Sequence, residues 1–163
     1  PLTVAQNLPD IDGMVIVTTP QDVALLDSRK SITFANSLKV AVIGVVENMS
    51  GYTIRGKAPA GTAIELAAPG GKTLKLTTDE NGEWAGTLDI FKAGGGERTA
   101  NDFGVPFLGK LPFDPGFVRG GDDGVHRIVS EPEGESSLAF AKVVTEIQDI
   151  VESASNSSGL EII

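Results

Sequence analysis

The sequence contains no cysteine among its 163 residues. Disulfides, thiolate catalysis, zinc fingers and cysteine-ligated iron–sulfur clusters are therefore excluded within this chain. The absence fits a reducing compartment, and we expect a cytoplasmic protein. Apolar runs are short, and none approaches the ~20 residues needed to span a bilayer, so we expect no membrane partner. The first ten residues, PLTVAQNLPD, lack the basic region of a signal peptide and an initiating methionine, and are typical of the interior of a longer chain.

Positive charge is also scarce. The chain has 13 lysines and arginines against 22 aspartates and glutamates, a net charge of -9. Nucleic-acid affinity comes mainly from clustered basic residues, so we expect no nucleic-acid partner. An acidic surface most often serves solubility. With 40% apolar and 21% charged residues, the chain can form a core, and its length fits one domain with a small insertion.

Two apolar runs without alternation, Gly13–Thr19 and Val40–Val46, predict strands buried on both faces, as in a parallel sheet. The segment between them has helical spacing and begins near Thr19 or Asp22, either of which could cap it. This order is a βαβ unit with a right-handed crossover. The remaining elements expected are a short helix after GGGE (94–97), a third strand over Val105–Leu111, ended by Pro112 and Asp114, and an amphipathic helix over Ser136–Glu152.

The middle of the chain has a different pattern. From residue 55 to residue 88 the apolar residues alternate with polar ones, which predicts half-exposed antiparallel strands. Turn residues, PGG at 69–71 and DENG at 79–82, separate these strands. Trp84, the one tryptophan, would anchor their small core. We predict α/β regions over residues 1–54 and 89–153, a β insertion of three or four strands over 55–88, and a flexible tail over 154–163.

Three strings of residues carry a family resemblance. TTPQDVALLDSRKS (18–31), VIGVVENMSGY (42–52) and FKAGGGERTANDFGVPFLGKLPFDP (91–115), followed by the terminal helix, resemble the Mrp/ApbC branch of P-loop NTPases. These are iron–sulfur cluster carrier ATPases of the MinD-like group with a deviant Walker A motif. The resemblance covers Leu2–Met49 and Phe91–Glu152. The opening PLTVAQNLPD is similar to the helix that follows the family's Walker B segment.

The resemblance implies the C-terminal part of a doubly wound, mainly parallel sheet, with ligands at the carboxyl ends of its strands. It also implies ATP with Mg²⁺ in the full-length protein, a dimer, and iron–sulfur client proteins. A MinD-like positioning ATPase is a further possibility, but it fits the strings less well and the terminal helix lacks a basic amphipathic face.

Asn48 stands just past the second strand, at the family's position for base recognition. A carboxamide offers an acceptor and two donors, enough to pair with an adenine edge. The alternative is a turn asparagine that caps the strand end. The resemblance likewise places Pro112, Phe113 and Asp114 along the base and ribose of the nucleotide. The alternative is that they form a plain Pro-Asp turn that ends the strand. It places Thr19 and Pro20 near the nucleotide or a subunit interface.

Other candidates have simpler explanations. Gly94–Gly96 could bind a phosphate at a helix start, but the segment lacks the Lys-Ser/Thr ending of a P-loop, which favours a structural turn. Arg29 and Lys30 are expected to be solvated helix charges rather than partner contacts. His126, the acidic turn at 79–81 and the Asp122-Asp123 pair are expected on the surface, without a metal.

Two absences limit what the resemblance implies. The family's glycine-rich loop and Walker B aspartate precede the matched region, so this chain alone is not expected to hydrolyse ATP. The family's cysteine pair, which holds a 4Fe-4S cluster, should follow NMS, yet no cysteine follows. The insertion there is similar to carboxypeptidase-regulatory or bacterial Ig-like repeats. Hence the family implies a 4Fe-4S cluster, whereas the residues of this chain contradict it. The alternative is a non-enzymatic protein that binds a partner through its β insertion.

Overall fold

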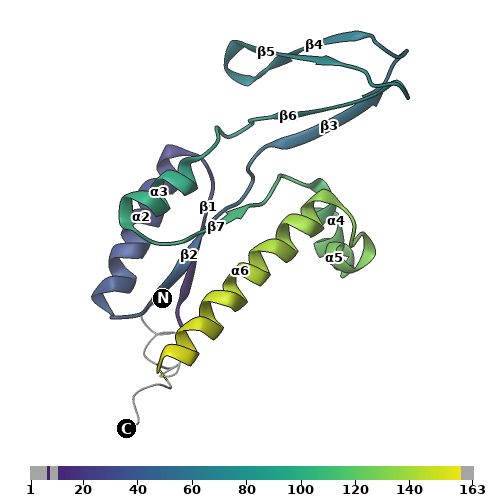
Figure 1. Ribbon diagram of the computed structural model, residues 1–163. Coiled ribbons are helices and arrows are strands. Elements are labelled where there is room, and N and C mark those ends of the chain that lie inside the picture. Colours follow the sequence, from purple (N-terminus) through teal and green to yellow (C-terminus); the bar gives the residue numbers. More distant parts are fainter. Residues whose placement is uncertain (1–6, 8–10, 159–163) are drawn as a thin grey trace.

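The computed structural model describes Asn7 and residues 11–158 (Figure 1). Apart from Asn7, which is helical and exposed, the helix expected from PLTVAQNLPD lies outside the described residues. The end of the expected tail, residues 159–163, lies outside them as well.

A parallel sheet forms the body of the protein. Its strands lie in the order β1-β2-β7, and both pairs are parallel. Helices α2 and α3 lie on one face and α6 on the other (Figure 1). The predicted α/β class and the predicted βαβ unit are therefore confirmed. The bounds are β1 Met14–Thr18, α2 Asp22–Ser37, β2 Val42–Glu47, α3 Gly95–Phe103, β7 Phe107–Lys110 and α6 Glu135–Ser158.

Two apolar clusters hold the layers together, one on each face of the sheet. The cluster under α2 and α3 is Ile16, Ile32, Val45 and Ala100. The cluster under α6 is Ile43, Val46, Leu108 and Val143. The central strand β2 contributes to both, which is why its sequence is apolar without alternation. The outer strand β1 is less covered, and Val17 is 60% exposed.

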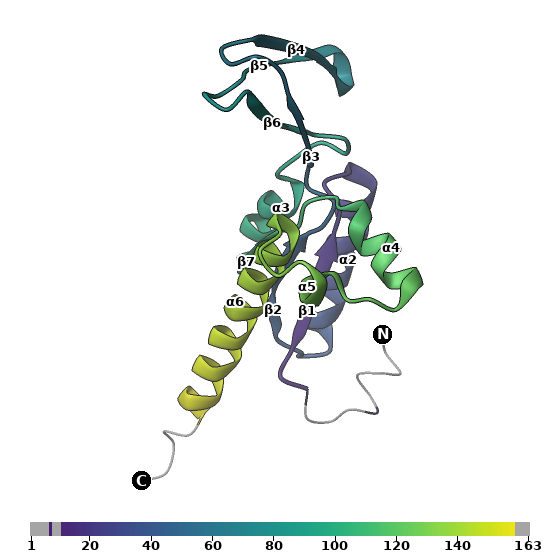
Figure 2. The same cartoon turned by 90° about the vertical axis from the view of Figure 1, so that its right-hand side faces the viewer.

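The insertion consists of four strands in two antiparallel pairs, β3 with β6 and β4 with β5. It extends away from the end of the sheet where β2 stops (Figures 1 and 2). We call residues 52–88 the β module. Leu74 and Leu76 of β5 pack over Gly86, so the two hairpins share a small apolar contact. The bounds are β3 Tyr52–Lys57, β4 Ala63–Ala68, β5 Lys72–Thr77 and β6 Glu83–Leu88, with a 3-10 turn at Pro69–Gly71.

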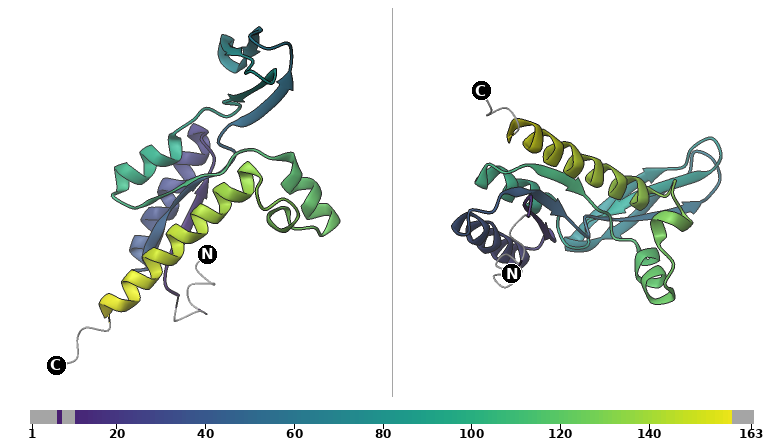
Figure 3. Two further views of the ribbon diagram at one scale, coloured as in Figure 1. Left: turned by 45° about the vertical axis from the view of Figure 1, so that its right-hand side comes forward. Right: turned by 90° about the horizontal axis from the view of Figure 1, so that it is seen from below.

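The β module touches the body through its first strand. Glu135 at the start of α6 accepts a hydrogen bond from Thr53 Oγ1 at 3.1 Å and pairs with Arg55 Nη2 at 2.7 Å. Both views in Figure 3 show that the start of α6 is the end of this helix nearer to the module. Tyr52 also meets Phe113 edge-on, with ring centroids 5.7 Å apart.

Several local expectations differ from the structure. No helix was expected between Asp114 and Ser136, but this segment contains α4 (Pro115–Asp123) and α5 (Arg127–Ser130). Asp114 caps α4 and Pro115 occupies its first turn, where proline is well tolerated. Neither Thr19 nor Asp22 caps α2: its N-cap is Gln21, without a side-chain hydrogen bond. Helix α6 continues to Ser158, beyond the boundary expected at residue 153. Among the described residues, no helix combines the length and apolarity that a membrane crossing would need.

Candidate functional site

The three parallel strands end at one edge of the sheet, and hydrogen bonds tie the loops that follow them together. Thr18, Glu47 and Lys110 are register partners at these ends. The Asn48 N–H donates to the Thr18 carbonyl at 2.7 Å, and the Leu111 N–H donates to the Glu47 carbonyl at 2.8 Å. The loops after β1, β2 and β7 therefore form one continuous surface, which is the position expected for a ligand in an open α/β sheet.

Asn48 lies at the centre of this edge and is half-buried. Its Oδ1 accepts a hydrogen bond from the Met49 N–H at 2.8 Å, and Met49 has the uncommon φ of 57°. Within the described residues, its Nδ2 group has no hydrogen-bond partner. The turn interpretation thus explains the oxygen, while two N–H donors stay free for a ligand.

On one side of Asn48 is a cavity of about 220 Å³ that we call the aromatic hollow. It brings together Asn48 with Pro112, Phe113 and Asp114, and their contact with a base or ribose stays a prediction. Helices α4 and α6 complete the wall with Phe117 and Phe140, whose ring centroids are 6.4 Å apart. Pockets for whole ligands usually measure ~300–1,000 Å³, so this hollow has room for a ring system rather than a whole nucleotide. Its other lining residues are Met49, Leu111, Val118 and Ser136.

On the other side of Asn48 is a second cavity, about 310 Å³, that we call the strand-edge hollow. It is lined by Thr19 and by polar residues of α2 such as Asp27, Ser28 and Ser31. Asn48 is the residue that both hollows share. Pro20 lines neither hollow because its side chain is fully buried. Any nucleotide contact by Pro20 would have to come from its main chain.

Asp114 is held by the protein itself. Its Oδ1 accepts from the Gly116 N–H at 2.7 Å, and its Oδ2 accepts from Arg127 Nε at 3.2 Å. Burial alone would raise the pKa of Asp114, but hydrogen bonds from Gly116, Ser136 and Arg127 outweigh it and lower this pKa below 3.8. Asp114 therefore fixes the start of α4 against the loop after β7, and it contributes to the hollow as a rigid wall.

Glu47 is the residue of this edge that the sequence analysis missed. Its side chain is fully buried at the end of β2. Oε1 accepts from the Ser50 hydroxyl at 2.6 Å and from the Gly94 N–H at 3.1 Å, and Oε2 accepts from the Gly96 N–H at 2.6 Å. We call this arrangement the Glu47 clamp. It joins the residues just before the β module to those just after it, directly beside Asn48.

The clamp also explains the triple glycine. The backbone amides of Gly94 and Gly96 at the start of α3 donate to the Glu47 carboxyl group, so a side chain of the protein itself occupies the anion-binding end of that helix. A Cβ at Gly96 would lie 2.9 Å from the Glu47 Cβ. The sequence signal was present in the acidic residue that ends an apolar strand and in the glycines before α3, but they are 47 and 49 positions apart.

The remaining candidates lie apart from this edge. Arg29 pairs with Asp102 at 2.6 Å, and Lys30 pairs with Asp27 at 3.2 Å, both on the surface as expected. His126 is exposed and precedes α5. Asp79 accepts backbone hydrogen bonds from Asn81 and Glu83, both at 2.8 Å, which closes the predicted turn.

The residues do not fit an iron–sulfur cluster. Such clusters require thiolates, with histidine as an occasional substitute, and the sequence has no cysteine and one histidine. Among the described residues, no group of three or more His, Asp or Glu side chains is placed to hold a metal ion. The segment after Ser50 continues directly into β3 instead.

Comparison with known proteins gives consistent matches. The family described as ParA, NUBPL iron-transfer P-loop NTPase, matches residues 1–66 and 76–148. The iron–sulfur cluster carrier protein of Methanocaldococcus jannaschii is 35% identical over 151 residues, which cover 93% of this chain and 42% of that protein. The carrier protein of Synechocystis sp. is 36% identical over 153 residues, 94% of this chain and 36% of that protein. The chain thus spans less than half the length of these curated relatives.

Solved structures match as well. The cell division ATPase MinD of Pyrococcus furiosus superposes with a TM-score of 0.53 at 19% identity, over 85% of this chain and 43% of that chain, which shows a shared fold. A nucleotide-binding protein of Archaeoglobus fulgidus, solved in complex with ADP, matches with a TM-score of 0.50 at 26% identity, over 86% of this chain and 44% of that chain.

Proposed function

The chain belongs to the NUBPL iron-transfer P-loop NTPase family, and from this premise we propose that it forms the base-binding side of an ATP site in an iron–sulfur cluster carrier. The observation that carries the proposal is Asn48, shared by two hollows and with its Nδ2 donors free among the described residues. The relative from Archaeoglobus fulgidus, which was solved with ADP, supports it.

In this proposal the aromatic hollow takes the adenine ring. Asn48 donates from Nδ2 to a ring nitrogen, and Pro112 and Phe113 provide an apolar wall. Thr19, on the other side of Asn48, lies toward the remainder of the nucleotide. The amides at the start of α3 do not hold the phosphates, because Glu47 occupies them. Phosphate and Mg²⁺ contacts are assigned to the family's glycine-rich loop, so this chain by itself should bind nucleotide weakly and leave ATP unhydrolysed.

The test is calorimetric titration with ADP. Replacing Asn48 by alanine removes hydrogen bonds worth about 1–2 kcal/mol, which is a loss of affinity of about five- to thirtyfold. The matched control is Asn36→Ala, because Asn36 is exposed near the far end of α2. Equal affinities for Asn48→Ala and Asn36→Ala would refute the assignment of the base site.

Carriage of an iron–sulfur cluster would require cluster-binding residues from outside this chain. Iron–sulfur clients follow from the carrier family, but this chain offers no thiolate. We therefore propose, as the second candidate, that the β module replaces cluster binding with the binding of a partner protein. Cluster reconstitution followed by visible absorbance separates the two: a stable cluster bound by this chain would contradict the second candidate.

We also propose that the protein self-associates. Strand β1 is an edge of the described sheet, and Val17 on it is 60% exposed. Unpaired edges with apolar side chains favour pairing with a second chain. A monomer by light scattering at micromolar concentration would contradict this proposal. The cytoplasmic location expected for the family stays a prediction.

A further inference from the structure

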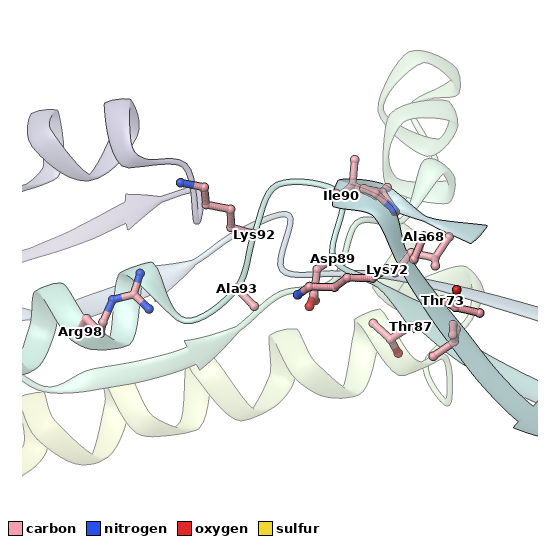
Figure 4. Close-up of a pocket in the computed structure, with 13 residues that line it drawn as sticks. Ala68, Lys72, Thr73, Thr87, Asp89, Ile90, Lys92, Ala93 and Arg98 are labelled. Atoms are coloured by element: carbon pink, nitrogen blue, oxygen red, sulfur yellow. The ribbon is translucent and has the colours of Figure 1, made fainter. Parts of the chain in front are cut away.

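A cavity of about 660 Å³ lies between the β module and the segment that leads into α3. We call it the basic cavity. Figure 4 shows that Lys72 reaches it from the start of β5, while Lys92 and Arg98 come from the segment before α3 and from α3 itself. Its walls thus come from two parts of the chain, the β4–β5 hairpin and the segment that runs from the end of β6 into α3. It is separate from both hollows beside Asn48, which share none of these lining residues.

The charge of this cavity is opposite to that of the chain. The whole chain carries a net charge of -9, yet three basic residues and a single acidic residue, Asp89, line the cavity. Lys92 is paired with Asp22. Lys72 and Arg98 form no salt bridge within the described residues. The positive charge of Arg98 still helps to lower the pKa of Asp22 from a longer distance. Two cationic side chains are therefore available to an incoming carboxylate.

The cavity is not purely polar. Leu74, Leu88 and Ile90 also line it, and Ile90 is 38% exposed. Basic groups beside apolar side chains match a segment in which acidic residues alternate with apolar ones. Such complementarity directs association and selects among partners.

We propose that the basic cavity docks a short acidic segment of a partner protein that also carries apolar side chains. A nucleic acid fits less well, because its affinity grows with the number of phosphates neutralised. Two available cations neutralise few phosphates, and the acidic remainder of the surface repels a long polyanion. The apolar lining would pack against leucine-like side chains of a peptide, but it offers no favourable interaction to a phosphate backbone. This docking site does not depend on the nucleotide site proposed above.

The experiment measures fluorescence anisotropy of a labelled short peptide of alternating glutamate and leucine, titrated with the full chain. The test variant is Lys72→Glu with Arg98→Glu. The control variant is Arg119→Glu with Lys142→Glu, which changes the net charge equally at two exposed residues outside the cavity. Circular dichroism verifies that both variants are folded.

We expect the cavity variant to weaken peptide binding by at least roughly tenfold, since like charges that face each other in an interface oppose association. The control variant should bind within about twofold of the unmodified protein, because exposed distant charges are largely screened. Equal weakening in both variants, or no binding by the unmodified protein, would overturn the proposal. So would a single-stranded oligonucleotide that binds the cavity more tightly than the peptide.

Discussion

Replacement of Glu47 by glutamine removes one acceptor oxygen while keeping the size of the side chain. In the Glu47 clamp, three donors converge on two fully buried oxygens, at 2.6 Å from Ser50, 3.1 Å from Gly94 and 2.6 Å from Gly96. Glutamine has one oxygen and an NH₂ group that only donates. The Ser50 hydroxyl can rotate to accept a hydrogen bond, but a backbone N–H cannot. Whichever way the amide turns, at least one glycine N–H loses its acceptor.

The expected cost follows from this count. A buried donor left without an acceptor costs about 1–3 kcal/mol, so we expect the free energy of unfolding to fall by about 2 kcal/mol. For a domain of this size, each 1 kcal/mol corresponds to about 2–4 °C in the midpoint temperature, which gives a decrease of about 4–8 °C. Urea unfolding followed by far-UV circular dichroism measures the free energy, and a thermal scan measures the midpoint.

Glu97→Gln is the matched control. Glu97 lies in the first turn of the same helix, but it is half-exposed and pairs with Lys110 at 3.1 Å. Loss of an exposed pair costs less than about 1 kcal/mol. If Glu47→Gln is no more destabilising than Glu97→Gln, the buried clamp does not stabilise the edge of the sheet and the reasoning is refuted.

Three further changes test the same region. Gly96→Ala should destabilise the protein by about 1–3 kcal/mol, because its Cβ would lie 2.9 Å from that of Glu47. Gly121→Ala, whose added Cβ would meet no atom within 4 Å beyond its own stretch of helix, should be neutral or slightly stabilising in the same urea assay, and equal effects of the two changes would contradict this. Asp114→Asn should lower the free energy of unfolding most at neutral pH. The lowered pKa of Asp114 contributes stability above pH 3.8, and this stability is lost as the pH falls through the pKa of the folded protein; a stability difference between the variant and the unmodified protein that grows in acid would contradict this. Glu135→Gln should lower the free energy of unfolding by less than about 1 kcal/mol in urea, because the ion pair of Glu135 with Arg55 is exposed. A larger decrease would show that this contact holds the β module in place.

Much of the fold follows from local patterns. The apolar runs predicted β1 and β2, and the structure places both in a parallel sheet with β7. Alternation predicted the strands of the β module, and the turn residues between them lie where expected. These predictions succeed because side-chain periodicity and turn chemistry depend on near neighbours along the chain.

The parts that could not be predicted depend on distant residues. Glu47 ends an apolar strand, and its role requires Gly94 and Gly96, which the fold brings to it. The burial of the Pro20 ring likewise depends on packing within the fold. Helix α4 is rich in glycine and was not expected, whereas Asp114 and Pro115 provide its start. In each case a tertiary contact or a cap outweighs local composition.

The two ends of the β module lie directly opposite each other, since Tyr52 of β3 is the register partner of Leu88 of β6. A segment that leaves and returns through adjacent points can change in length or sequence without shifting the strands on either side of it. The host sheet and the module are therefore free to diverge at different rates. Natural variation can rewrite what the outer hairpin contacts while the edge that carries Asn48 keeps its geometry, which makes this junction a natural point for building chimeric proteins.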